Sequence, residues 1–423
     1  MLALLLLGAM AAACTGVPGG DAASAGRVAS DVDRVAAPEV TADETARLVA
    51  GHTAFAFDLL QAVRREPGNL FFSPFSVSFA LAMTSAGARG NTLRQMEDVL
   101  QFGLEQEALH RAANALDQEL QARDRESDET QDHGFALRLV NSTWGQIGYE
   151  FLPGFLDLLA ANYGAGMRLV DYAGDPEAAR REINTWVSER TEGRIEELLP
   201  QGMVTADDRL TLVNAVYFLA PWESPFPEEL TADAPFHLVD GTQASVPTMQ
   251  QVEYFRYAEG DGYRAVELPY DGGDLAMLLL APDEGALERV ESSLSLASLD
   301  ELVGRLDERR VALWLPRFRV EWGEELSAIL YAMGMTDAFD PAAADFSGMD
   351  GTRNLSIGFV MHKAFVSVDE EGTEAAAATA VGMRLGGAPE PPIELRFDRP
   401  FLFLIRDLPT GAVLFVGRVA DPR

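Results

Sequence analysis

Residues 362–387 read HKAFVSVDEEGTEAAAATAVGMRLGG, and the interpretation of the whole chain depends on them. The first part alternates apolar and polar residues, which is typical of a strand. The part after Gly372 is rich in small residues and contains no proline. Every second residue from Thr373 onward is uncharged, whereas Glu374 and Arg384 lie on the interleaved face. This period of two predicts a strand with one face suited to burial, and a proline would have removed a hydrogen-bond donor from a central strand.

Two other structures fit the residues after Gly372. A surface helix is favoured by alanine and glutamate. However, Thr373 is followed three positions later by Ala376 rather than by glutamate, so no capping box forms there. A linker is favoured by the small side chains. Spacing alone therefore leaves a strand-forming loop, a helix and a linker open.

Composition places the chain among soluble globular proteins. It has 423 residues, of which 48% are hydrophobic, and that is ample for a large core. The formal net charge is -33, and an acidic surface of this kind repels phosphate backbones. We therefore expect neither nucleic acid nor heparin as a partner.

The order of the predicted elements indicates an α+β fold. Helical periodicity dominates from residue 44 to residue 102, and strand-like alternation appears at 135–146. The run at 210–222 is also strand-like but nearly all apolar, so we expect it to be buried on both faces. After residue 236 short alternating runs follow one another, interrupted by one helical patch at 326–339. Helices first and strands later, without regular alternation, predict mixed or antiparallel sheets in one domain.

The N-terminal part contains the only cysteine, Cys14, at the end of the apolar run MLALLLLGAMAAAC. The run is too short to span a bilayer and resembles a bacterial lipoprotein signal, with lipid attached to Cys14. No basic residue precedes the run, and Ala11 stands where leucine is usual, so a plain secretory signal and a non-exported chain stay open. We expect a signal peptide over 1–14 and a flexible tether over 15–40, rich in Gly, Ala, Ser and Asp. The protein is expected to be exported, either anchored at the cell envelope by this lipid or secreted.

No common catalytic motif is found in the chain. It has no GxSxG elbow, HExxH, P-loop or GxGxxG. The position of Cys14 excludes a Cys/His nucleophile. We therefore expect no enzyme, no metal and no cofactor. The histidines show no ligand spacing between any two of them; they are His52, His110, His133, His237 and His362.

The stretch at 360–380 resembles the hinge of the serpin family, and the resemblance extends over residues 41–423. Three further stretches resemble serpin motifs in the order usual for that family. They are NLFFSPFSVSFALAM at 69–83, LVNAVYFLAPWESPF at 212–226 and RPFLFLIRDLPTGAVLFVGRVADP at 399–422. The resemblance implies helices plus three β-sheets, with a large mixed central sheet and an exposed reactive loop at about 372–396.

The resemblance also implies an activity, the inhibition of serine proteases by suicide-substrate trapping. The loop is cleaved, an acyl-enzyme forms, and the freed segment inserts as an extra strand of the central sheet. The expected partner of this monomer is a subtilisin-, chymotrypsin- or trypsin-like protease. The alternative is a non-inhibitory serpin with a carrier, structural or substrate-like role. Heparin-dependent members use a basic helix, and the matching stretch at 91–110 is net acidic.

Site residues follow from the same resemblance. The polar cluster under the point where the sheet parts, called the shutter, matches Ser73, Ser76, Asn214 and His362. The breach, where the strand first enters, matches Trp222, and Arg317 there is expected to pair with Glu370. The hinge matches Glu370, Glu371, Gly372, Thr373, Glu374, Ala375, Ala376, Ala377, Ala378 and Thr379.

The scissile bond is placed at Gly386–Gly387 by the family's commonest spacing from the hinge. Glycine is a poor specificity residue, so two neighbouring bonds remain as alternatives. Cleavage after Leu385 would suit a chymotrypsin- or subtilisin-like enzyme, and cleavage after Arg384 a trypsin-like enzyme.

Overall fold

The structure is a computed structural model that describes residues 26–123, 136–373 and 391–423. Helices and strands are both abundant in these ranges, and the predicted α+β class is confirmed. The helices are α1 (Ala42–Val63), α2 (Pro74–Ser85), α3 (Gly90–Val99), α4 (Gln106–Gln121), α5 (Pro153–Tyr163), α6 (Pro176–Arg190), the 3-10 turn η1 (Glu228–Leu230), α7 (Leu287–Ser293), α8 (Leu296–Arg305), α9 (Ser327–Met333), α10 (Thr336–Phe339) and α11 (Ser347–Asp350).

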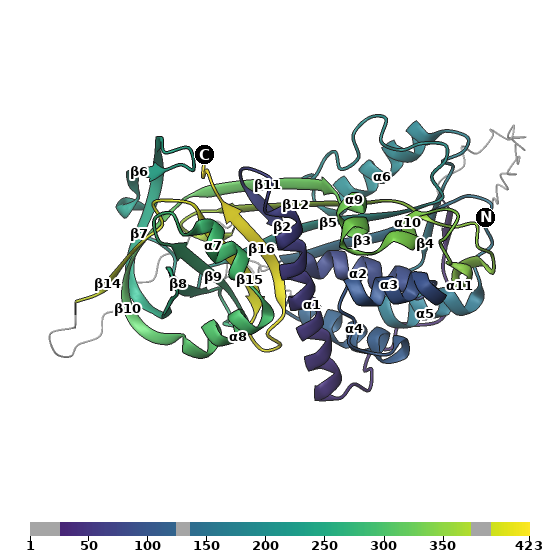
Figure 1. The fold of residues 1–423 in the computed structure, drawn as a ribbon, viewed down its shortest axis with the longest axis horizontal. Coiled ribbons are helices and arrows are strands. Elements are labelled where there is room, and N and C mark those ends of the chain that lie inside the picture. The colour runs from purple at the N-terminus through teal and green to yellow at the C-terminus, as the bar shows by residue number, and fades with distance from the viewer. Residues whose placement is uncertain (1–25, 124–135, 374–390) are drawn as a thin grey trace, which may run out of the picture.

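Sheets run the length of the molecule, with most of the helices at the end opposite β14 (Figure 1). The strands are β1 (Gly26–Val28), β2 (Leu70–Phe72), β3 (Ala136–Gln146), β4 (Met167–Val170), β5 (Leu210–Pro221), β6 (Ala232–His237), β7 (Gln243–Gly260), β8 (Tyr263–Pro269), β9 (Leu275–Pro282), β10 (Asp307–Pro316), β11 (Phe318–Glu325), β12 (Ile357–Val368), β13 (Gly372–Thr373), β14 (Ile393–Arg396), β15 (Phe401–Asp407) and β16 (Val413–Val419).

The first sheet is the large mixed sheet that the sequence predicts. Its order is β1-β4-β3-β5-β13-β12-β11, with a direct pairing of β5 and β12 beside the short β13. The β5–β12 pairing is parallel, whereas β3–β5 and β11–β12 are antiparallel. Two long strands in the middle of the sheet therefore run in the same direction, and β13 lies between them at one end.

In the described residues the second and third of the expected sheets are continuous with each other, and their strands join into one nine-stranded sheet. Strand β7 is the reason, because its 18 residues pair in succession with β6, β10 and β8. A strand of this length carries one continuous ladder through regions that would otherwise be separate sheets.

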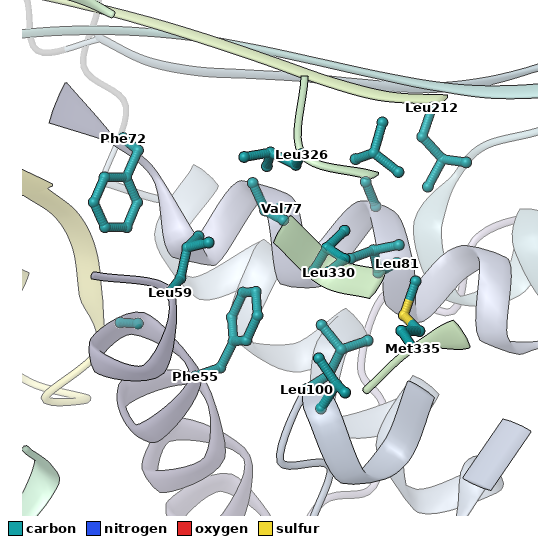
Figure 2. Close-up of a cluster of buried hydrophobic side chains, with 14 of the residues drawn as sticks. Phe55, Leu59, Phe72, Val77, Leu81, Leu100, Leu212, Leu326, Leu330 and Met335 are labelled. Atoms are coloured by element: carbon teal, nitrogen blue, oxygen red, sulfur yellow. The ribbon is translucent and has the colours of Figure 1, made fainter. Parts of the chain in front are cut away.

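Helix α2 forms the centre of the core beneath the mixed sheet. Ser73 caps its N-terminus by accepting a hydrogen bond from the Ser76 amide, and Pro74 occupies the first turn, where its missing N–H is not needed. All twelve residues of α2 are buried, which is the pattern of a helix enclosed on every side. Figure 2 shows side chains of α1, α2 and α9 packing together beneath Leu212 of β5.

Residues 26–40 do not form the free tether that the composition of 15–40 predicts. Strand β1 adds an antiparallel edge strand to β4. The Arg34 guanidinium then binds Asp117 Oδ2 at 2.6 Å and Asn114 Oδ1 at 2.8 Å, both on α4. Polar composition alone cannot foresee this, because the partners lie far away in the sequence. We call residues 26–40 the N-terminal strap.

No helix in the ranges 26–123, 136–373 and 391–423 is both long and apolar enough to cross a membrane.

The strap should stabilise the fold mainly through Arg34. Burial raises the pKa of Asp117, although Arg34 and Gln121 oppose that rise. Replacing Arg34 with Ala leaves the buried Asp117 carboxylate without its cation, and we expect a loss of about 1–3 kcal/mol in the free energy of unfolding. Chemical denaturation measures this loss as a lower midpoint.

The matched control is Arg305→Ala, which removes an exposed ion pair with Glu301 at 3.9 Å. Such surface pairs contribute about 0.5 kcal/mol or less. Equal midpoints for the Arg34 and Arg305 variants would show that Arg34 adds no more stability than an exposed ion pair does.

Candidate functional site

The candidate site is the seam where β5 and β12 meet. Residues Ile357 to Phe365 of β12 pair in parallel with Leu210 to Tyr217 of β5. Beyond this ladder the two strands separate and β13 enters between them, antiparallel to both. The seam is therefore closed along most of its length and already holds a strand at one end.

Gly372 and Thr373 are the two hinge residues that form this inserted end. A Cβ on Gly372 would lie 2.3 Å from the Ala220 carbonyl oxygen and 2.6 Å from Pro221 Cα, so only glycine fits. Thr373 is completely buried and its hydroxyl lies 2.9 Å from the Tyr270 hydroxyl. The sequence placed Thr373 on the face suited to burial, and the structure buries it.

Tyr270 and Trp222 form the wall beside Thr373. Their rings stack with centroids 4.6 Å apart and an angle of 8° between the planes. Burial raises the pKa of Tyr270, so its hydroxyl stays protonated and available for the hydrogen bond to Thr373. The Trp222 indole Nε1 donates to the Asp369 carbonyl oxygen at 3.1 Å, and its backbone amide donates to the Glu371 carbonyl oxygen at 2.7 Å. Trp222 thus holds the turn that precedes Gly372 at two points.

The expected ion pair between Glu370 and Arg317 is present. Arg317 Nε and Nη2 lie 2.8 Å and 2.7 Å from Glu370 Oε1, and the Thr231 hydroxyl donates to the same oxygen. Burial opposes ionisation of Glu370, but these hydrogen bonds outweigh it and hold the carboxyl pKa below its ordinary value. The Phe226 amide donates to the Glu370 carbonyl oxygen at 2.7 Å. The base of the hinge is thereby fixed to its surroundings through both side chain and backbone.

The four predicted shutter residues lie together under the seam, and all are fully buried. The Ser73 amide donates to His362 Nε2 at 3.1 Å, which leaves Nδ1 protonated and directed at the Asn214 side-chain oxygen. The Asn214 amide in turn donates to the Ser76 hydroxyl oxygen. These contacts link α2 to both strands of the seam.

Asn141 of β3 is a fifth member of the shutter cluster that the sequence reasoning missed. Its Oδ1 accepts from the Ser76 hydroxyl at 2.7 Å and from the Asn214 amide. It lies directly opposite Asn214 in the β3–β5 register. An asparagine within the strand-like run at 135–146 is a signal, since an amide that is even partly buried needs hydrogen-bond partners. Pairing register, however, is not visible in the sequence.

The opposite face of the seam is covered by α6 and the segment that follows it. Ile183 and Val187 of α6 pack in a cluster with Phe359 and Met361 of β12. The Lys363 ammonium donates to the Glu197 carbonyl oxygen at 3.1 Å, which attaches that segment to β12. Opening the seam therefore requires changes on both faces of the sheet.

Several predicted positions lie outside the described residues. They are Cys14, the hinge residues Glu374, Ala375, Ala376, Ala377, Ala378 and Thr379, and the loop residues Arg384, Leu385, Gly386 and Gly387. In the part of the chain that the structure describes, no three His, Cys, Asp or Glu side chains are grouped so as to hold a metal ion.

Stability should fall with acid because buried histidines are kept neutral. Burial lowers the pKa of His362 to about 3, and that of His52 and of His110 to about 4. In the unfolded chain the histidine pKa values are about 6.5, so below that pH the unfolded chain binds more protons than the folded protein does. The stabilisation is therefore complete above about pH 6.5 and is lost as the pH falls toward 4. We expect a lower urea midpoint at pH 5.0 than at pH 7.5.

His52 provides the test variant for this pH dependence, because both its ring nitrogens are buried without a hydrogen-bond partner. Its ring packs against Phe75 and Phe79, so His52→Phe replaces a titrating ring by an apolar one. The midpoint of this variant should change less between pH 7.5 and 5.0. A wild-type midpoint that is constant over this interval would contradict the assignment.

Comparison with known proteins agrees with this geometry. A model of the family described as Serpin (serine protease inhibitor) matches residues 50–422. The human leukocyte elastase inhibitor is 39% identical over 387 residues, which are 89% of this chain and all of that protein. An uncharacterised serpin-like protein of Thermococcus kodakarensis is 40% identical over 374 residues, 88% of this chain and 84% of that one.

Solved structures show the same fold. The thermophilic serpin tengpin in its native state superposes with a TM-score of 0.84 at 28% identity, covering 94% of this chain and 100% of that one. Uncleaved ovalbumin gives a TM-score of 0.78 at 29% identity, with coverages of 89% and 100%. The chain has the serpin fold and belongs to the serpin family of serine protease inhibitors.

Proposed function

We propose that the chain inhibits serine proteases as a suicide substrate, with its reactive loop as bait. The observation that carries the proposal is the position of Gly372 and Thr373 between β5 and β12. A strand that continued from Thr373 along the seam would have a neighbour on each side. The uncharged face that begins with Thr373 would then be buried.

The direction of β13 would make insertion of the cleaved loop between β5 and β12 energetically favourable. Because β13 is antiparallel to both neighbours, an inserted strand would replace one parallel ladder by two antiparallel ladders. Antiparallel pairing is slightly more stable per residue than parallel pairing. Each added hydrogen bond contributes about 0.5–1.5 kcal/mol net, so about ten inserted residues give a large driving force.

In the proposed reaction the protease's serine attacks the carbonyl carbon of the residue before the scissile bond. The peptide bond breaks, the amine of the following residue leaves with a proton from the protease's general acid, and an ester joins protease and loop. Insertion of the freed segment would then carry the esterified protease away before water cleaves the ester. We retain Gly386–Gly387 as the bond, with cleavage after Leu385 or Arg384 as the alternatives.

The shutter cluster would act as a closure that can open once the loop is cut. Its contact between His362 and Asn214 joins the two strands that must separate, so insertion has to break it. Buried polar groups are costly to leave without partners. We propose that this keeps the seam closed in the uncleaved protein.

The proposed partner is a subtilisin-, chymotrypsin- or trypsin-like protease, bound by a monomer. Several relatives are named leukocyte elastase inhibitors, which supports a protease as the target of this chain as well. The class of protease depends on which of the three bonds is cut.

The test is incubation with a panel of trypsin-, chymotrypsin-, elastase- and subtilisin-like proteases. An inhibitor forms a complex that survives denaturing gels, and the mass of the released C-terminal peptide locates the bond. Cleavage without complex formation would support the alternative of a non-inhibitory serpin. In the same assay Thr373→Arg should abolish the complex and leave rapid cleavage, because an arginine does not fit at this completely buried position, so the inserted end is expelled and no strand can extend from it along the seam.

The control for this substitution is Thr352→Arg in an exposed turn. It adds the same side chain away from the seam and should leave complex formation unchanged. A Thr373→Arg protein that still forms complexes would overturn the insertion mechanism.

We also propose that the protein is exported and anchored by lipid on Cys14, or otherwise secreted. The apolar run that ends at Cys14 supports this proposal. The anchored form should be found in the membrane fraction, and Cys14→Ala should release it into the soluble fraction. If wild type and Cys14→Ala were divided in the same way between the membrane and soluble fractions, the lipid anchor would be contradicted.

A further inference from the structure

A row of arginine and tryptophan side chains crosses the mixed sheet on the face that α6 covers. In the β1–β4 register Arg27 lies opposite Arg168, and in the β3–β4 register Arg168 lies opposite Trp144. Side chains that lie directly opposite each other on neighbouring strands point to the same face of a sheet. Trp144 belongs to the hydrophobic cluster that α6 covers, so the whole row lies on that face. Strand β4 lies at the opposite end of the molecule from β14 (Figure 1).

The guanidinium of Arg168 is held by two tryptophan rings. Its carbon lies 5.4 Å from the centre of the Trp144 ring and 4.5 Å from that of Trp186, which belongs to α6. The centres of the two rings are 5.7 Å apart, and the planes meet at 78°. Contact with aromatic rings uses the faces of a guanidinium and leaves the N–H groups at its edge available. Arg168 is partly exposed, so a ligand can reach it from solvent.

Arg190, in the last turn of α6, adds a third cation to this row. Its guanidinium carbon lies 6.0 Å from the centre of the Trp186 ring. In the part of the chain that the structure describes, none of these three arginines forms an ion pair with a carboxylate. Burial lowers the pKa of Arg168, the charges of Arg190 and Arg27 lower it further, and Glu182 only partly offsets them. The three cations therefore repel one another, and an anion bound among them would relieve that repulsion.

The two indole N–H groups beside Arg168 are a second, independent sign of a ligand. The Nε1 atoms of Trp144 and Trp186 are buried and have no hydrogen-bond partner among the described residues. The Trp144 side chain is completely buried. Buried donors are nearly always paired, so an unpaired one requires an explanation. Each Nε1 lies at the edge of a ring that faces the Arg168 guanidinium, so both donors border the same site. We call Arg27, Arg168, Arg190, Trp144 and Trp186 the arginine–tryptophan site.

The chemistry of this site defines the class of ligand. Arginine binds phosphate and sulfate through two parallel N–H···O bonds, and its planar guanidinium suits that geometry. The chain has a formal net charge of -33, so a polyanion or an anionic membrane would be repelled by the surrounding surface. A small oxyanion meets mainly the charges within about 8 Å, the Debye length at physiological salt. We propose that the arginine–tryptophan site binds a small oxyanion, inorganic phosphate or sulfate.

The bound oxyanion joins three elements that are distant in the sequence. It contacts the N-terminal strap through Arg27, β4 through Arg168 and α6 through Arg190. A ligand that binds the folded chain and not the unfolded chain stabilises the fold by mass action. Because α6 covers the seam, the oxyanion also holds that cover against the edge of the sheet. This site goes beyond the proposed function and does not depend on it.

The test is equilibrium dialysis of the whole chain against radioactive inorganic phosphate at about pH 7.5. We expect saturable binding of one phosphate per chain. Sulfate should displace it, whereas chloride at the same ionic strength should not. Arg168→Gln and Arg190→Gln should each weaken binding at least about tenfold, because each removes charge-assisted hydrogen bonds to the ligand.

The matched control is Arg65→Gln, which removes an exposed arginine from the turn after α1 and should leave the affinity for phosphate unchanged. Arg190 is exposed as well, so Arg190→Gln provides the test if Arg168→Gln fails to fold. The proposal would be overturned by absence of saturable binding to wild type, by equal affinities of Arg190→Gln and Arg65→Gln, or by displacement of phosphate by chloride. No protease takes part in the measurement, so its result is independent of the inhibitory mechanism.

Discussion

The parallel pairing of β5 with β12 is the interaction on which the rest of the structure depends. It joins the two halves of the mixed sheet, and it is covered by α2 on one face and by α6 on the other. Because β5 and β12 run in the same direction, a strand between them can be antiparallel to both, and β13 takes that direction. In the mechanism proposed above, the sheet would exchange this one pairing for two.

Polar contacts, rather than apolar packing alone, hold this seam together. His362 and Asn214 face each other across it, and the Ser73 amide fixes the imidazole from below. An apolar seam would lose little specificity if it slipped by two residues, because similar side chains would meet again. A buried hydrogen-bonded cluster has satisfied partners in only one register. The cluster therefore fixes the register of β5 on β12 as well as their contact.

Much of the hinge could be predicted from the sequence, because its pattern is local. The alternation after Gly372 marked Thr373 as a residue for burial, and motif resemblance supplied the pairing of Glu370 with Arg317. Contacts that depend on long-range register were missed. Asn141 joins the shutter only because β3 brings it opposite Asn214.

The joining of two sheets and the docking of the N-terminal strap were also not predicted, because both depend on contacts that are distant in the sequence. The union of the second and third sheets depends on the length of β7, and short alternating runs in the sequence do not reveal where one ladder ends. The docking of the N-terminal strap depends on Asp117 and Asn114 of α4, which are distant from Arg34 in the chain. Composition indicates only how strongly a segment tends to be ordered by itself. The strap is ordered because α4 provides partners for Arg34.

The pairing of β2 with β16 has a consequence for how the molecule is made. Leu70, near the start of the fold, pairs with Arg418, almost at its end. During synthesis β2 must therefore wait without its partner until nearly the whole chain has emerged. Contacts of such long sequence separation form late and slowly. The strands of the seam, β5, β12 and β13, are all synthesised before β16, so they are available to pair before the last strand of the other sheet is. Under the mechanism proposed above, the arrangement that forms first would then be retained kinetically until a protease cut the loop.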